Sequence, residues 1–222
     1  MTLEDLIRRF RVLSGDREQP YFWDAADLAD WFTDAERQAC IRGRLLRDDS
    51  TQSVCQIALT PGTRTYRLHK SVYELISVRL LPASGERPRM MRLHSREWLD
   101  QHRPDWRAGD CQADVVVQDD TRIHVVGSFE PGDKLLLECY RTPLRPLQDF
   151  GDAPEIHEAH HEHLILWALH KAFSVVDAET LDAQRSAAAE ASFTRYFGPM
   201  PDSDLRRITR HDEPHHNDMV LP

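Results

Sequence analysis

The sequence has little of the material from which many catalytic and binding sites are built. Nine glycines over 222 residues leave few positions for loops that cradle phosphates. No G-x-S-x-G, Walker loop or glycine-rich dinucleotide-binding turn is present. The four cysteines lie far apart without C-x-x-C spacing, which argues against a zinc knuckle and a thioredoxin-type redox pair. The sequence therefore gives no reason to expect a cofactor.

Long apolar runs are also absent. No apolar stretch reaches the roughly 18 residues that a membrane span needs. The first residues, MTLEDLIRRF, carry acids where a signal peptide would have a basic and then an apolar stretch. We therefore expect a cytosol-like compartment and no membrane partner. The formal charge of -9 argues against broad, non-specific attraction to nucleic acid, although an acidic surface can face DNA that must slide past it.

Helical spacing of apolar residues is present at both ends of the chain. A capping box at Thr2 and Asp5 precedes a short amphipathic helix predicted over 3–13. A longer helix is predicted over 25–46, with one apolar stripe. From residue 154 the helical period returns in two further segments, which end at Gly198-Pro199.

Between about residues 53 and 141 the apolar period changes to two, as in strands. A hairpin is predicted over 53–69, with its turn at Pro61-Gly62. Further strands are predicted over 73–81, 89–93, 113–126 and 131–141, with a turn at Asp119-Asp120 and a short helical crossing over 96–106.

These patterns predict an α+β fold in which helices from both chain ends pack as a bundle. A mostly antiparallel β-sheet is inserted between them, and the chain ends in an extended C-terminal tail. The expected parts are a bundle from residues 1–50 and 150–198, a β insertion over 51–149 and a tail over 199–222.

The segment EIHEAHHEH, residues 155–163, contains a literal zinc-protease motif. In H-E-x-x-H, two histidines one helical turn apart bind the metal and the glutamate acts as general base. Here these residues are His157, His161 and Glu158. Four histidines and three glutamates in nine positions make an accidental match common, and the third-ligand position of the extended motif is Trp167. A zinc-dependent hydrolase remains an alternative.

A helical wheel places histidines on both faces of this helix, which favours a structural or interfacial cluster over one metal site. His157 and His161 share the face most apt to pack inward. The opposite face carries His160, His163, Trp167 and His170. A second alternative is a small-ligand binding module in which Trp98 and Trp106 stack on a sugar or base, although a cap over the sheet is the simpler interpretation of these two residues.

The order of features resembles the head-tail adaptor (connector or neck) proteins of tailed bacteriophages. The segments that carry the resemblance lie between residues 3 and 198 and are FWDAADLADWFTDAERQACIRGRLLRDD, IALTPGTRTYRLHKSVYELISVRLL, LLLECYRTPLRPL, IHEAHHEHLILWALHKAFSVVDAET and FTRYFG. In such proteins the penultimate long helix commonly opens with a histidine before an apolar run, which here is His161.

The resemblance implies a non-enzymatic virion protein at the head-tail junction, assembled in the host cytoplasm. About a dozen copies would form a ring under the portal protein, extend the DNA channel without sequence-specific binding and present a surface for tail or nozzle proteins. A closed ring needs contacts between unlike faces, and the face with His160, His163, Trp167 and His170 is a candidate subunit interface.

The C-terminal segment is polar and without periodicity. Because the C-terminal segment of adaptor families often reaches toward the portal, the resemblance implies that the tail docks there. The candidate docking residues are Leu205, Arg206, Arg207, Ile208 and Arg210.

Overall fold

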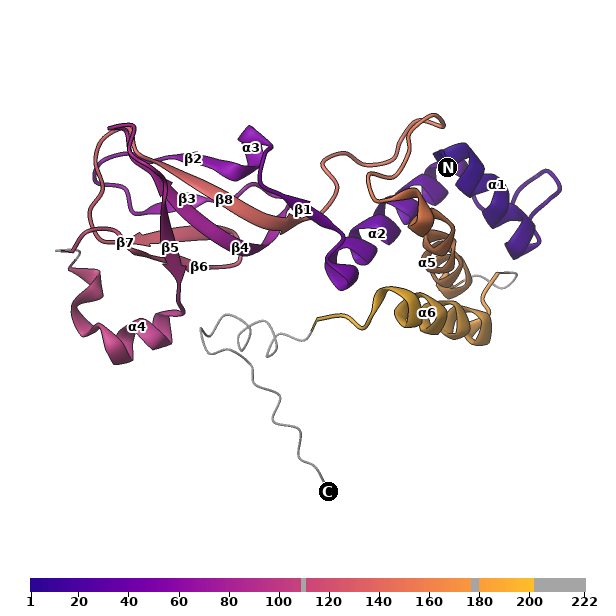
Figure 1. Ribbon diagram of the computed structural model, residues 1–222. Coiled ribbons are helices and arrows are strands. Elements are labelled where there is room, and N and C mark those ends of the chain that lie inside the picture. The colour runs from indigo at the N-terminus through magenta and orange to yellow at the C-terminus, as the bar shows by residue number, and fades with distance from the viewer. Residues whose placement is uncertain (109–110, 177–179, 202–222) are drawn as a thin grey trace, which may run out of the picture. The chain divides into compact units, whose positions relative to one another are not determined.

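The computed structural model describes residues 1–108, 111–176 and 180–201, which divide into two compact units (Figure 1). The helical unit consists of Met1–Arg47 and of residues 140–201, and the β unit of residues 48–139. The predicted α+β class with a mostly antiparallel sheet is confirmed. The bundle and the tail over 199–222 stay predictions.

The helical unit contains α1 (Leu3–Ser14), α2 (Ala25–Gly43), α5 (His161–Ser174) and α6 (Ala183–Phe197). The capping box forms as predicted, because the Thr2 side chain accepts from the Asp5 N–H while the Asp5 carboxylate accepts from the Thr2 N–H. α2 ends earlier than the predicted residue 46. Arg44 adopts a left-handed conformation with φ 51°, and Leu46–Asp48 becomes strand β1.

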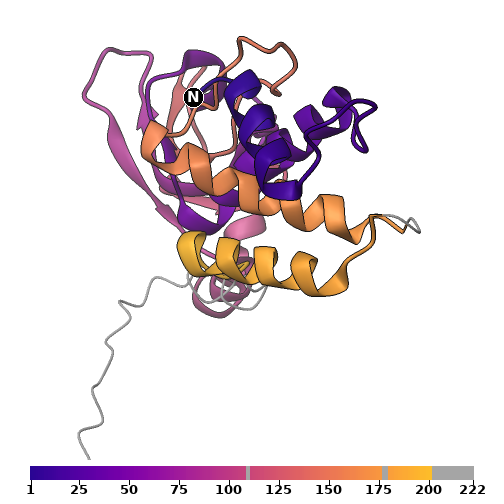
Figure 2. The ribbon, with the colours of Figure 1, turned by 90° about the vertical axis from the view of Figure 1, so that its right-hand side faces the viewer.

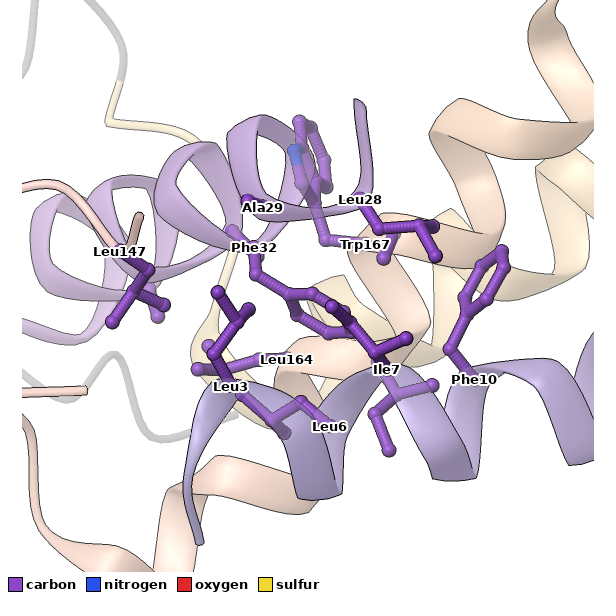
Figure 3. Packing of buried hydrophobic residues seen from close by; sticks show 14 of the residues in the cluster. Leu3, Leu6, Ile7, Phe10, Leu28, Ala29, Phe32, Leu147, Leu164 and Trp167 are labelled. Carbon is purple, nitrogen blue, oxygen red and sulfur yellow. The ribbon is translucent and has the colours of Figure 1, made fainter. Parts of the chain in front are cut away.

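α5 contacts the other helices of this unit, α1, α2 and α6. Figure 2 shows α5 between α1 and α6. Leu164, Ile165 and Ala168 are at most 1% exposed, as expected for the inward face of a helix. The side chains around them form one apolar cluster, of which Figure 3 labels Leu3, Leu6, Ile7, Phe10, Leu28, Ala29, Phe32, Leu147, Leu164 and Trp167.

Outside the predicted hairpin over 53–69, whose first residues form the helix α3, the strands and short helices of the β unit follow the predicted pattern closely. Its elements are α3 (Gln52–Cys55), β2 (Gln56–Ala58), β3 (Thr65–Arg67), β4 (Val72–Leu81), β5 (Arg89–Leu93), α4 (Arg96–His102), η1 (Pro104–Arg107), β6 (Val115–Gln118), β7 (Arg122–Val126) and β8 (Lys134–Arg141). The sheet order is β1-β8-β4-β5-β6-β7-β3, with β2 also paired to β8. β5 and β6 run parallel, whereas β2–β8, β3–β7, β4–β5 and β6–β7 are antiparallel.

The predicted hairpin over 53–69 is wrong as a strand pair, because β2 pairs with β8 and β3 with β7. The turn at Pro61-Gly62 nevertheless forms as predicted, since the Thr63 N–H donates to the Thr60 carbonyl oxygen at 3.0 Å. The Tyr66 side chain also contacts this turn. Its hydroxyl lies 2.6 Å from the Thr63 carbonyl oxygen and accepts from the Thr60 N–H at 2.9 Å. The turn at Asp119-Asp120 is confirmed, since β6 and β7 pair across it.

Two further sequence-based expectations concern cysteines and membrane spans. The four cysteines are free thiols, and Cys40, Cys55 and Cys139 are buried. Within the described ranges, no helix is both long and apolar enough to cross a membrane.

Candidate functional site

The histidine-rich segment does not form the regular helix that the zinc motif requires. Glu158–His160 is a 3-10 turn, η2, and α5 begins only at His161. His157 caps this turn, because its Nδ1 accepts from the Ala159 N–H at 3.1 Å. The Glu158 carboxylate lies 3.1 Å from the amino group of Met1.

His161 is buried, with 4% of its side chain exposed. Its Nε2 lies 2.9 Å from the Ile156 carbonyl oxygen, and its Nδ1 lies 3.2 Å from the Met1 nitrogen. Because a carbonyl oxygen only accepts, Nε2 carries the hydrogen and Nδ1 accepts from the ammonium group. Both ring nitrogens are therefore engaged in holding the start of α5, which gives His161 a structural role.

The hydrolase alternative receives no support from this arrangement. Over the ranges that the structure describes, no three His, Cys, Asp or Glu residues are grouped to hold a metal ion. His157 is exposed on the turn while His161 points into the unit, so the two rings do not converge on one point.

The opposite face of α5 contacts α6 within the same chain. The rings of His163 and Tyr196 stack at 3.5 Å, and Trp167 packs on Phe193 at 5.1 Å. His160 Nδ1 lies 3.1 Å from the Tyr196 hydroxyl oxygen.

His170 completes this face, with its Nδ1 3.0 Å from the Ser186 hydroxyl oxygen. Burial, and then the nearby His157, lowers the pKa of His160, which favours its neutral ring. The predicted subunit interface stays a prediction, and Trp167 is already buried by α6.

Glu36 is a site residue that the sequence analysis missed. Its side chain on α2 is 1% exposed and accepts from the backbone N–H groups of Glu155 and Ile156 at 2.5 and 3.2 Å. Burial raises its pKa to about 7. Glu36 lies four residues after Phe32 and three before Ala39, on the apolar stripe of α2, and this position was the available signal.

Glu36 lines an open pocket of about 580 Å³ together with residues of the segment 144–155. The segment is held at both ends. Leu147 is buried and exchanges hydrogen bonds with the Thr33 hydroxyl, and Glu155 pairs with Arg141. Between these anchors, Phe150 is 56% exposed. The segment is therefore a fixed loop with one aromatic ring at its surface.

The tryptophans of the β unit have no open ring face for a ligand. Trp98 is stacked between His94 at 3.6 Å and His102 at 4.4 Å. Trp106 is 5% exposed and belongs to an apolar cluster with strands β6 and β7. This geometry supports the interpretation of a cap over the sheet rather than that of a small-ligand binding module.

The predicted docking residues of the tail lie outside the described residues. These residues are Leu205, Arg206, Arg207, Ile208 and Arg210.

Comparison with known proteins gives one family, and no curated protein matches the chain. The sequence model of the SU10 adaptor protein family matches residues 1–215, a range that includes both the helical unit and the β unit. This extent is nearly the whole chain, so the match does not rest on one short motif. The chain therefore belongs to the SU10 adaptor protein family of phage head-tail adaptors.

Proposed function

We propose that this chain is a structural virion protein that forms a ring of about twelve copies beneath the portal, extends the DNA channel and joins head to tail. The observation that carries the proposal is the family match over residues 1–215. Membership of an adaptor family indicates a structural head-tail connector role, and the ring, its copy number and its position are the proposal.

Charge supports a role beside DNA that has to move. The chain carries 28 Lys and Arg against 37 Asp and Glu, a formal charge of -9. A negative wall repels the phosphate backbone and keeps DNA from sticking to it. We propose that DNA passes through the ring without sequence-specific binding.

A ring that lies between head and tail would have a binding partner at each of its two ends. One end of the ring binds the portal protein, and the other receives tail or nozzle proteins after assembly in the host cytoplasm. We propose that the tail over 199–222 docks on the portal through Leu205, Ile208 and the basic residues Arg206, Arg207 and Arg210. Neighbouring copies contact each other through unlike surfaces, and the exposed parts of His160, His163 and His170 are candidate contact positions there.

Native mass measurement of the chain with the purified portal protein tests this function. We expect largely monomeric protein without the portal, and a portal-bound ring of about twelve copies with it. A chain in which residues 202–222 are replaced by a Gly/Ser linker of equal length tests the tail. We expect this variant to lose portal binding while keeping its urea unfolding midpoint. Intact assembly of the variant would contradict the role of the tail, and no complex with the wild-type chain would contradict the function.

A further inference from the structure

Most of the exposed large apolar side chains of the helical unit gather at one end of it. This apolar end surface consists of Val12, Leu13, Tyr21, Phe22, Val175, Val176 and Leu181, which are 39% to 89% exposed. They come from the end of α1, the loop after it, the end of α5 and the approach to α6.

Contacts among neighbouring residues bring the segments that carry the apolar end surface together. Phe22 packs on Trp23 at 6.0 Å, and Trp23 packs on Phe173 at 5.8 Å. The Arg185 guanidinium lies 3.9 Å from the Phe173 ring and donates to the Leu13 carbonyl at 3.2 Å. The Asp182 N–H donates to the Phe173 carbonyl, which brings the start of α6 to the same place.

A second exposed apolar feature, Phe150, stands by itself on a loop tied by hydrogen bonds. The Asp152 carboxylate accepts from the Gln148 and Asp149 N–H groups, both at 2.9 Å. The carbonyls of Phe150 and Asp152 accept from the Glu4 and Leu3 N–H groups at the start of α1. The ring is therefore displayed on a preorganised loop, which lowers the entropy that binding would cost.

The two features lie at opposite ends of α1. The loop of Phe150 caps its first residues, while Leu13 belongs to its last turn. The helix has 12 residues, which corresponds to about 18 Å at about 1.5 Å per residue. Figure 1 shows the 142–157 loop beside the start of α1 and the 15–24 loop at its other end.

We propose that Phe150 of one copy packs on the apolar end surface of the next copy. This inference rests on the proposed ring. A head-to-tail ring needs two unlike surfaces that fit each other on every copy, and in a ring of about twelve they face directions about 150° apart. An exposed aromatic on a fixed loop and an apolar surface at the far end of the same helix are two unlike surfaces of this kind. Buried aromatic anchors commonly dominate such interfaces.

Disulfide formation between copies tests the contact directly. In a Cys111→Ser background, which removes the exposed native thiol, chains with Phe150→Cys and chains with Phe22→Cys are mixed and assembled on the portal. We expect a disulfide-linked dimer of the two chains on mild oxidation. The control mixture pairs Phe150→Cys with Ala191→Cys, an exposed position on α6, and we expect no dimer from it.

Phe150→Asp provides the second test. We expect it to raise the concentration needed for half-assembly of rings by about tenfold or more. Phe150→Leu should keep most of the assembly, and both variants should keep the wild-type urea midpoint because the side chain is exposed. Normal assembly of Phe150→Asp, or rings without the disulfide, would overturn the contact while leaving the proposed function intact. If a single copy needed Phe150 to bind the portal, that result would also overturn the proposed contact between copies. Absence of any ring from wild-type protein would instead contradict the proposed function.

Discussion

Glu36 shows how burial changes the chemistry of a single residue. Its carboxylate receives two backbone N–H groups, but burial outweighs them and raises its pKa to about 7. In the unfolded chain the same group has its ordinary value of 4.5. Between these values the folded protein holds a proton that the unfolded chain releases. Stability from Glu36 is therefore fully present below about pH 4.5 and is lost as the pH rises to about 7.

Glu36→Gln should remove this dependence, because the amide stays neutral and its oxygen can still accept from the N–H groups of Glu155 and Ile156. We expect the variant to gain stability over the wild type as the pH rises from 4.5 to 7, by at most about 3 kcal/mol. Urea unfolding at pH 5, 6, 7 and 8 measures the difference. Glu18→Gln, at an exposed position, serves as control and should give a constant difference. A constant difference for Glu36→Gln would contradict this account.

His157 and His161 should respond unequally to substitution. His161→Ala removes a buried ring and leaves the Ile156 carbonyl without its donor, so we expect a loss of about 2–4 kcal/mol of unfolding free energy. His157→Ala removes only an exposed cap and should cost about 0.5–1 kcal/mol. Urea unfolding gives both values. If the two histidines were zinc ligands, untagged protein would instead contain stoichiometric zinc, and both substitutions would remove it.

For single residues, the sequence predicted whether a side chain faces the core better than it predicted what that side chain does. The helical wheel correctly placed His161 on the inward face, because that face depends only on spacing. It was wrong for His157, which is exposed because the α-helix begins only at His161. It gave no sign that Trp167 would be buried by α6, since the partner of a helix face is set by contacts distant in sequence. Glu36 was overlooked because a carboxylate is rarely buried, although its neighbours marked the position as internal.

The sequence predicted where helices and strands occur, but it did not predict which strands pair with each other. The apolar spacing predicted α1 to within one residue, and the change from period 3.6 to period 2 located the β segment. The hairpin at Pro61-Gly62 failed because turn residues indicate a reversal but not which strands then pair. The turn forms, but β2 pairs with β8 and β3 with β7, which are distant in sequence.

The turn after β7 depends on one glycine. Gly127 has φ +102°, and an added Cβ would lie 2.6 Å from the Cys111 carbonyl oxygen. We expect Gly127→Ala to lower the unfolding free energy by about 2–4 kcal/mol, from backbone strain together with the clash. Gly62→Ala is the matched control, since its φ is +80° with no atom within 4 Å, and it should cost only about 1 kcal/mol. Equal costs in thermal unfolding would show that the close approach contributes nothing.

The contact between α5 and α6 should stabilise the single chain. Phe193 is fully buried and packs on Trp167 and Phe197, so we expect Phe193→Ala to cost about 3–5 kcal/mol. Arg195→Ala, at an exposed position on the same helix, should change stability by less than about 0.5 kcal/mol. Urea unfolding of dilute, monomeric protein distinguishes the two. A small cost for Phe193→Ala would mean that α6 packs elsewhere in the free chain.

At the scale of the whole molecule, the order of helices and strands along the chain indicated the family better than any short motif did. The literal zinc motif at residues 157–161 led toward an enzyme, whereas the succession of helix, β insertion and helices led to the adaptor family that the match over 1–215 shows. Copy number, register and the surface that meets the portal depend on other chains, so neither the sequence nor the fold of one chain determines them.

Electron microscopy of purified virions from the phage that encodes this chain tests the central claim most directly. We expect a ring of about twelve copies directly below the portal, with density that fits both the helical unit and the β unit. Virions that carry complete necks without this chain, while the chain is found free in the infected cell, would contradict the account.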